Sequence, residues 1–487
     1  MDKSVRKPAA GLPGEVSAND VSPATLQVGR RSSAYVIALS CVAAIGGFLF
    51  GFDSGVINGA VDALAKAFAT QAAGTGFAVA SVLLGCALGA FGAGTLADSL
   101  GRRPTMLLNA ILFLVSAVAT GAANSALIFI AARIAGGIAI GAASVLAPMY
   151  IAEVAPAHMR GRLVSLNQLT IVIGILAAQL LNMAIARTVP TGSTAAMIAQ
   201  SWNGQFGWRW MFTLVAAPSV LFFVSAMFVP ESPRWLVKNG SPDRARELLT
   251  RIGGEAYAAT ETENIRQTIS VAEVSRVRLA DLLEPKLLKI LLIGCGLAVL
   301  QQWSGINVLF NYADNIFKNA GFGVNTTLLF IVITGVVNAA FTFVALGTVD
   351  RWGRRGLMLF GCAGIAAAHV LTGLAYAIHL QGVAVLLFVL AAIGCYAMSL
   401  APVTWVVISE LFPNRIRGTA ISVAVSALWI ACFVLTYTFP LLERSIGTGN
   451  TFWLYAAICV AGFFFVFLKL PETKNKSLEQ IERELAD

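Results

Sequence analysis

The sequence predicts an all-α membrane protein with twelve transmembrane helices in two parallel six-helix repeats, joined by a helical linker. Three observations predict this fold. The 487 residues are 57% hydrophobic and only 12% charged, whereas a soluble domain carries about 25% charged residues. The apolar residues lie in blocks close to the ~20 residues that a helix needs to cross a bilayer. The two halves of the chain also repeat the same charged motifs.

Twelve apolar blocks are the predicted spans, six in each half of the chain. The first six lie at residues 34–57, 77–97, 105–122, 126–150, 163–186 and 209–229. The second six lie at residues 287–317, 327–349, 357–378, 383–408, 419–440 and 451–470. These blocks define an N-terminal half at residues 34–229 and a C-terminal half at residues 287–470.

Three polar segments complete the predicted organisation. Residues 1–33 are rich in Ser, Pro, Gly and Ala and hold no short apolar core with a cleavage site. They are therefore expected to form a disordered cytosolic tail rather than a signal peptide. Residues 230–286 hold two stretches with helical patterning, which predict a cytosolic linker of amphipathic helices. Residues 471–487 are expected to form a short cytosolic C-terminal tail.

The positive charges indicate how the chain is oriented. The net charge is +9, but only five Lys and Arg residues fall in loops on the side opposite the termini: Lys66, Arg187, Arg209, Lys318 and Arg444. By the positive-inside rule this asymmetry places both termini in the cytosol of a multi-pass protein of the cytoplasmic membrane. The basic balance thus fits a lipid bilayer as the partner and requires no nucleic acid.

The residues that often carry catalysis or bind metals are scattered. All seven cysteines lie in apolar blocks, without the spacing of a metal site or a redox motif, so they are expected to serve packing. The three histidines, His158, His369 and His379, fall on separate predicted elements. The sequence therefore predicts no enzyme, no cofactor and no metal.

Charged motifs recur in the two halves. The loop after the second span reads Gly94-Thr-Leu-Ala-Asp98-Ser-Leu-Gly101-Arg102-Arg103, and the matching loop of the second half reads Gly347-Thr-Val-Asp350-Arg-Trp-Gly353-Arg354-Arg355. Glu153 and Arg160 follow the fourth span, and Glu410 and Arg417 follow the tenth. Repetition at an even number of spans indicates two halves of like orientation, with a site at their interface near the membrane midplane, as in alternating-access carriers.

These motifs carry a resemblance to a known family. Pro230-Glu231-Ser232-Pro233-Arg234-Trp235 closes the first half and Pro471-Glu472-Thr473-Lys474 closes the second. Together with the doubled Asp-x-x-Gly-Arg-Arg motif, they resemble the sugar porter family of the major facilitator superfamily. The run Ala155–Gln168 is most similar to bacterial xylose and hexose:proton symporters. The resemblance implies the major facilitator fold and secondary active transport of a monosaccharide, with a proton as coupling ion. We also expect the chain to function as a monomer.

The repeated charges suggest a latch on the cytosolic side. Carboxylates at these positions can receive guanidinium groups or helix-terminal N–H groups. We expect them to form ion pairs between the halves that hold this side closed. The residues are Asp98, Arg102, Arg103, Glu153, Arg160, Glu231, Arg234, Asp350, Arg354, Arg355, Glu410, Arg417 and Glu472. The alternative is that the arginines only set the topology.

Two opposite charges lie inside predicted spans, Asp53 in the first and Arg133 in the fourth. A charge at the bilayer centre costs roughly 2.5–3.5 kcal/mol on insertion scales, so the two are natural partners. The resemblance implies that Asp53 is the proton-coupling carboxylate and that Arg133 responds to it, whereas passive facilitators typically have Asn at the position of Asp53. The alternative is a static buried pair that serves helix packing.

Amides and aromatic rings at membrane depth are candidate sugar ligands. A sugar needs amide partners for its hydroxyls and a ring for its C–H face. The resemblance implies eight such positions: Phe50, Gln168, Gln301, Gln302, Asn307, Asn311, Asn338 and Trp405. Amides also join helices, and adjacent residues do not share a helix face, so one of Gln301 and Gln302 can be a packing residue.

Two departures from the family pattern leave the solute open. Asn311-Tyr312 stands where xylose symporters have paired tyrosines, and Leu428 stands where an amide is expected before Trp429. A pentose, a hexose, a polyol or an inositol remains compatible with the sequence. A passive facilitator is the first alternative to a symporter, and a non-transporting sugar sensor is the second.

Overall fold

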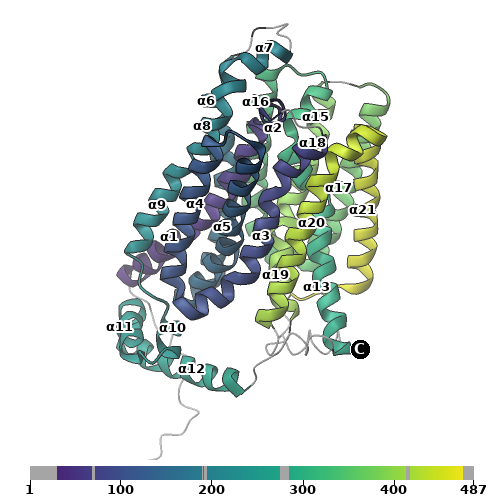
Figure 1. The fold of residues 1–487 in the computed structure, drawn as a ribbon. Helices are drawn as coiled ribbons and strands as arrows, with labels where there is room; N and C mark the ends of the chain where they lie inside the picture. The colour runs from purple at the N-terminus through teal and green to yellow at the C-terminus, as the bar shows by residue number, and fades with distance from the viewer. Residues whose placement is uncertain are drawn as a thin grey trace, which may run out of the picture.

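The computed structural model describes residues 30–68, 72–188, 190, 195–274, 284–380, 382–412 and 417–474. Every regular element in these ranges is a helix. Twelve helical segments among the described residues are long and apolar enough to cross a membrane, which confirms the predicted fold class. Figure 1 shows them as a bundle whose helices run roughly along one direction.

The N-terminal half supplies six of these segments. They are α1 (Arg30–Val56), α3 (Ala72–Leu100), α4 (Arg102–Ala122), α5 (Ala126–Val154), α6 (Ala157–Ile185), and α8 (Trp208–Thr213) continued by α9 (Ala216–Met227). Short elements that the sequence did not indicate lie at one end of the bundle. They are η1 (Ile57–Gly59), α2 (Val61–Ala67), α7 (Ala195–Gln200) and the π-helical η2 (Asn203–Gly207).

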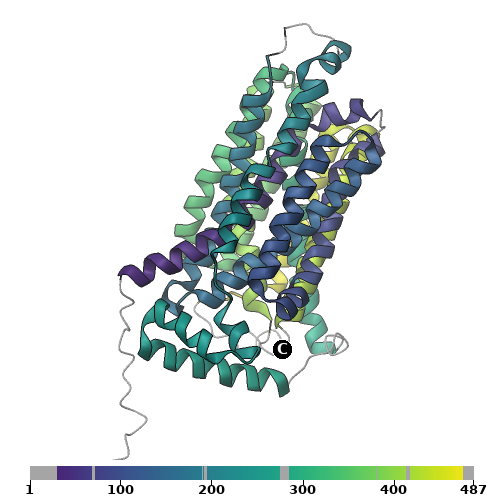
Figure 2. The same ribbon diagram turned by 60° about the vertical axis from the view of Figure 1, so that its left-hand side comes forward.

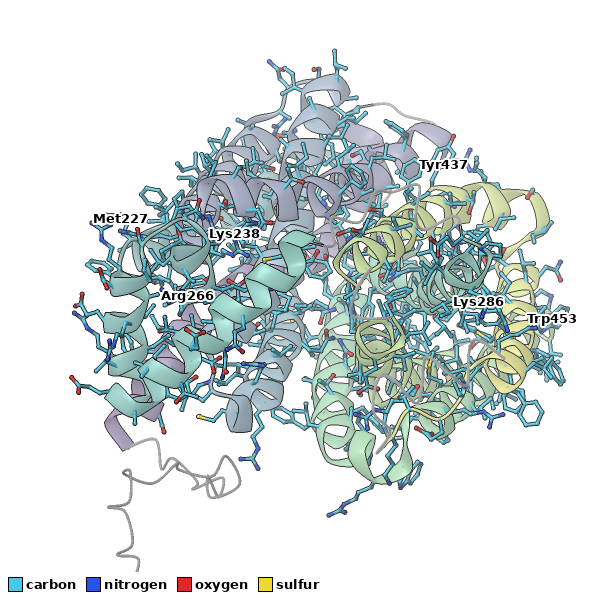
Figure 3. All side chains as sticks on the ribbon, turned by 90° about the horizontal axis from the view of Figure 1, so that it is seen from below. Met227, Lys238, Arg266, Lys286, Tyr437 and Trp453 are labelled. Atoms are coloured by element: carbon cyan, nitrogen blue, oxygen red, sulfur yellow. The ribbon has the colours of Figure 1, made fainter. Side chains whose placement is uncertain are left out.

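Three helices of the linker lie at the opposite end: α10 (Pro233–Lys238), α11 (Pro242–Gly253) and α12 (Glu255–Val274). We call the end that carries them the linker side and the other end the distal side. Figure 2 shows α1 beginning on the linker side, close to these helices. The view from the linker side places Lys238 and Arg266 with the N-terminal half, whereas Lys286 and Trp453 belong to the C-terminal half beside it (Figure 3).

The C-terminal half repeats the arrangement with two interrupted spans. Its elements are α13 (Pro285–Trp303), α14 (Ile306–Asn311), α15 (Ala313–Asn319), α16 (Val324–Trp352), α17 (Arg354–Ala377), α18 (Val383–Met398), α19 (Leu400–Leu411), α20 (Arg417–Ile446) and α21 (Thr448–Lys469). The predicted helix 287–317 breaks at Ser304 and Gly305, where Gly305 has a φ of 85°. The predicted helix 383–408 breaks at Ser399.

The first of these breaks is stabilised by a buried histidine. Nε2 of His369 on α17 donates to the carbonyl oxygen of Ser304 over 2.8 Å. Only glycine readily adopts a positive φ, and a Cβ at Gly305 would lie 3.0 Å from His369 and Tyr455. The interruption is therefore built into the packing of three helices.

Two helix pairs make the most extensive contacts between the halves. α3 lies beside α20, and α6 lies beside α16. Near the distal side, η1 also contacts α14 and α15. The interface between the halves consequently passes between α1 and α14, where the polar residues predicted as ligands are located.

Candidate binding site between the two halves

A cavity of about 130 Å³ lies at this interface, several times the space that one water molecule needs. Both halves contribute to its wall, from α1, α3, α5 and α6 on one side and from α13, α14, α16, α18, α19 and α20 on the other. All eight residues predicted as sugar ligands line it: Phe50, Gln168, Gln301, Gln302, Asn307, Asn311, Asn338 and Trp405. The structure thus brings them together, while their role as ligands stays a prediction.

The amides of the C-terminal half form a hydrogen-bonded chain. Nε2 of Gln301 donates to the backbone carbonyl oxygens of Leu400 and Ala401, each over 3.2 Å. Nε2 of Gln302 donates to Oε1 of Gln301 over 3.1 Å, and Nδ2 of Asn307 donates to Oε1 of Gln302. Both glutamines line the cavity, but Gln301 also anchors the start of α19, so it serves packing as well.

An aromatic pair closes one wall of the cavity across the interface. The rings of Phe50 on α1 and Trp429 on α20 meet edge to face, with centroids 5.3 Å apart. Trp429 and Tyr396 line the cavity and were not among the residues predicted from the sequence. One sequence feature could have pointed to Trp429: the family pattern places a cavity residue at position 428, directly before it. Leu428 also lines the cavity.

The two buried charges meet beside the cavity. Nη1 of Arg133 lies 2.7 Å and 2.8 Å from the two carboxylate oxygens of Asp53. Asp53 is 7% exposed and Arg133 is 2% exposed. The guanidinium also lies 5.2 Å from the ring centroid of Phe212. Arg133 lines the cavity directly, so a movement of this side chain can connect the carboxylate to the solute site.

A charged cluster lies on the linker side of the N-terminal half. Nε and Nη2 of Arg102 donate to the two carboxylate oxygens of Glu153 over 2.9 Å and 2.8 Å. Glu231 accepts from the backbone N–H groups of Arg102 and Arg103 over 2.8 Å and 3.2 Å, at the first turn of α4. Asp98 pairs with Arg102 over 2.9 Å. The cluster fastens α4, α5 and the chain before α10 to one another.

The C-terminal half repeats this cluster at its own linker side. Arg354 pairs with Glu410 over 3.2 Å. Glu472 accepts from the backbone N–H groups of Arg354 and Arg355 over 2.9 Å and 3.1 Å. The hydroxyl of Thr473 donates to Glu410 over 2.7 Å. The sequence repeat therefore corresponds to two clusters of matching design, one in each half.

The remaining predicted latch residues differ in their positions. Arg160 and Arg234 are exposed, and the side chains of Asp350 and Arg417 lie outside the described residues. Burial raises the pKa of Tyr257 on α12 to about 12, with a smaller contribution from Glu261, and the positive charge of Arg160 opposes this rise. The ion pairs of Arg102 with Glu153 and of Arg354 with Glu410 lie within one half each, so ion pairs between the halves stay a prediction.

The sequence matches a known family along nearly its whole length. The family model described as "Sugar (and other) transporter" matches residues 39–485. The glucose transport protein of Synechocystis is 43% identical over 461 residues, covering 92% of this chain and 97% of that protein. The arabinose-proton symporter of Bacillus subtilis is 38% identical over 454 residues, covering 93% of this chain and 96% of that protein.

The fold also matches a solved transporter. The inward-open structure of the xylose transporter XylE from E. coli superposes with a TM-score of 0.80 and 34% sequence identity. The match covers 92% of this chain and 100% of that chain. The similarity therefore includes both halves and the interface between them.

Proposed function

The chain belongs to the sugar porter family of the major facilitator superfamily, and from this premise we propose that it carries a monosaccharide together with a proton across the cytoplasmic membrane. The observation that carries the proposal is the cavity between the halves, lined by amides and aromatic rings and adjoined by the Asp53–Arg133 pair. Alternating access follows if the halves rock about this cavity. Because one chain encloses the whole cavity, a monomer suffices.

The linker side faces the cytosol in this proposal. The linker helices carry Arg244, Arg246, Arg251 and Arg266, and positive residues near short loops remain on the cytosolic side. The described chain also begins with α1 and ends after α21 on this side. The distal side is then the outer side.

The amide chain is suited to hold sugar hydroxyls. Asn307 and Gln302 are already linked to Gln301, so their orientation is fixed before a solute arrives, which lowers the entropy lost on binding. Gln168 and Asn338 come from α6 and α16 and face the same cavity. A sugar whose hydroxyls bind both Gln168 and the amides of the C-terminal half connects the two halves. The ring of Trp405 offers an apolar surface for the C–H face of the sugar.

The buried ion pair is suited to couple proton binding to the movement. While Nη1 of Arg133 contacts both carboxylate oxygens of Asp53, the ionised carboxylate is compensated. A movement of Arg133 away from Asp53 leaves a buried negative charge, which is neutralised by a proton. Conformation and protonation are thereby linked, so that a proton gradient drives the solute.

Replacement of Asp53 by Asn tests the coupling. The amide keeps the size of the side chain but holds no exchangeable charge, so uphill accumulation of labelled sugar in energised vesicles is expected to disappear. Exchange of internal for external sugar needs no net proton movement and is expected to continue. Asp243→Asn on α11 removes a carboxylate outside the bundle and should leave both activities unchanged. Unchanged accumulation by Asp53→Asn would refute symport and favour a passive facilitator.

One assay can identify the solute. Counterflow in proteoliposomes with a panel of labelled pentoses, hexoses and polyols identifies it, with and without an imposed proton gradient. Leu428 is buried at 1% exposure and contributes no hydrogen-bonding group to the cavity wall, so we expect one fewer hydroxyl contact than an amide at this position would allow. Absence of counterflow with every member of the panel would refute the proposed solute class.

A further inference from the structure

A second pocket lies on the distal side of the same interface. Its wall includes Gly59, Ala186, Val324 and Leu328, together with the charged residues Lys66, Asp314 and Lys318. Lys318 and Asp314 form an ion pair of 2.6 Å. We call this the outer pocket. Charged groups from both halves surround it, so it is suited to hold water rather than lipid.

Three structural elements line both the outer pocket and the central cavity. Residue Ile57 of η1 lines the cavity and Gly59 lines the outer pocket. Along α6 the corresponding residues are Ile175 and, just past the helix end, Ala186, and along α16 they are Asn338 and Val324. Both spaces therefore lie along the same three elements, and the stretch of these elements between them is a closed segment of the interface.

The closed segment holds buried polar groups that have no partner. Asn58 and Gln179 are each 1% exposed and Thr327 is 0% exposed. Neither amide atom of Asn58 or Gln179, nor the hydroxyl of Thr327, has a hydrogen-bond partner. Gln179 reaches from α6 to α16, where a Cβ at Gly335 would collide with its Oε1. Asn58, Gln179 and Thr327 thus come from both halves.

Unpartnered groups of this kind are rare in native structures, since each loses its hydrogen bonds to water without replacement. Other described residues also carry such groups, but these three come from both halves and lie in one closed segment of the interface, which favours a second state of the protein in which they are paired. All three are uncharged, and together they both donate and accept hydrogen bonds. These are the properties of a surface that binds the hydroxyls of a neutral polyhydroxylated solute.

We propose that Asn58, Gln179 and Thr327 form an outer hydroxyl-binding subsite, which the solute occupies between the outer pocket and the central cavity when the distal side opens. The subsite rests on the proposed function, because it takes the same solute. It differs from the central cavity in position: none of the three residues lines that cavity. The polar groups of the subsite therefore change the rate at which the solute passes to the central cavity, and they leave the affinity of that cavity for the solute unchanged.

Two apolar replacements of similar size test the subsite: Gln179→Met and Thr327→Val. Uptake of a sugar that the wild type transports is measured in proteoliposomes, and the Kd for the same sugar is measured by tryptophan fluorescence in detergent. We expect kcat/KM for uptake to fall about two- to tenfold in each variant, the effect of one lost hydrogen bond, with a Kd within about twofold of wild type. The Tm of each variant should equal or exceed that of the wild type.

Thr334→Val is the matched control. Thr334 is also 0% exposed and lies on α16 two turns beyond Thr327, but its hydroxyl donates to the carbonyl oxygen of Ile331 over 2.6 Å. Its kcat/KM should stay near that of the wild type. Unchanged kcat/KM in both test variants, an equal fall in Thr334→Val, or a rise in Kd as large as the fall in kcat/KM would each overturn the subsite.

Two further results separate the subsite from the proposed function. A clear fall in Tm in both test variants would show that the polar groups are paired in the closed state, for example by structural water, and would also overturn the subsite. Wild-type protein that takes up no pentose, hexose or polyol would overturn the proposed function and the subsite together. Uptake by the wild type with unchanged variants overturns the subsite alone.

Discussion

Neighbouring amides in the central cavity have different partners, which gives them different roles. Gln301 donates two hydrogen bonds to the backbone where α18 breaks into α19. Gln302 donates only to Gln301 and accepts from Asn307. Gln301 therefore supports the helix break. Gln302 is held in place by other side chains, and its amide can still form further hydrogen bonds with a solute in the cavity.

Paired replacements of these two residues by Leu separate the roles. Gln301→Leu removes the side-chain donor to the carbonyl oxygens of Leu400 and Ala401, so we expect a loss of about 1 kcal/mol in stability, visible as a lower Tm. Gln302→Leu leaves the backbone bonds intact, so its Tm should change less, while its Kd for sugar rises about tenfold or more. A larger fall in Tm for Gln302→Leu than for Gln301→Leu would contradict this division.

Helix packing in the N-terminal half depends on close backbone contacts between α3 and α5. A Cβ at Gly85 would collide with the carbonyl oxygen of Ile134, and a Cβ at Gly137 would collide with that of Val82. In lipid, burial of apolar side chains between helices contributes little free energy, so helices associate mainly through close packing. Small residues allow that close packing. This pair of helices accordingly forms a rigid unit that can move as one body against α20.

Gly85→Ala is expected to separate α3 from α5. The new methyl group would clash with the backbone carbonyl oxygen of Ile134, and backbone cannot move aside by changing rotamer as a side chain can. Overpacking of this kind costs about 1–3 kcal/mol, so we expect a lower Tm and lower transport. Gly92→Ala on the same helix is the matched control, since no atom of a neighbouring residue lies within 4 Å of the position that its Cβ would take. A similar Tm for both variants would argue against the close contact.

The sequence predicted the elements well and their interruptions poorly, for physical reasons. Twelve spans follow from apolar length alone, because the bilayer sets that length. The segments that contain the breaks at Gly305 and Ser399 still have a mean hydropathy typical of a span, so hydropathy alone does not indicate the breaks. The contacts at the breaks come from helices remote in sequence: His369 donates to the carbonyl oxygen of Ser304 at the first break, and Gln301 donates to those of Leu400 and Ala401 at the second.

The central cavity was easier to predict than the outer subsite. Resemblance to the family indicated eight of the cavity residues one by one, but the aromatic residues Trp429 and Tyr396 were not among them. Gln179 and Thr327 are ordinary polar residues in predicted spans, and Asn58 directly follows one. They became informative only when the structure showed that they are buried, lie between two pockets and have no partner.

At the scale of the whole molecule, two like clusters of charge lie on the linker side of two like halves. In each cluster an arginine pairs with a glutamate on a neighbouring helix, Arg102 with Glu153 and Arg354 with Glu410. A second glutamate accepts from two backbone N–H groups at a helix start, Glu231 in one half and Glu472 in the other. The repeated motifs of the sequence contain these six residues, but Arg160 and Arg234 of the same predicted set are exposed. The predicted bonds between the halves stay a prediction, since spacing along the chain does not determine partners in the other repeat.

The predicted latch therefore concerns a second conformation of the protein, in which the clusters of the two halves contact each other. Bonds within one half are present whether the linker side is open or closed, so they cancel in the equilibrium between the two states. Only a contact that exists in one state shifts that equilibrium. If the clusters of the two halves meet when the linker side closes, Glu153 and Glu410 then gain partners from the opposite half, and neutralising either one favours the state that is open on the linker side.

Cys432 offers a native probe for that shift, because it lines the central cavity and is buried at 2% exposure. In inside-out vesicles, a membrane-impermeant maleimide should modify Cys432 faster in Glu153→Gln and in Glu410→Gln than in the wild type. Loss of about 1–2 kcal/mol in the closed state corresponds to a five- to thirtyfold shift. Glu247→Gln removes a charge of the exposed pair with Arg251 on α11 and should leave the rate unchanged. Equal rates in all four proteins would mean that the clusters only stiffen each half, and slower labelling in the two variants would mean that they hold the linker side open.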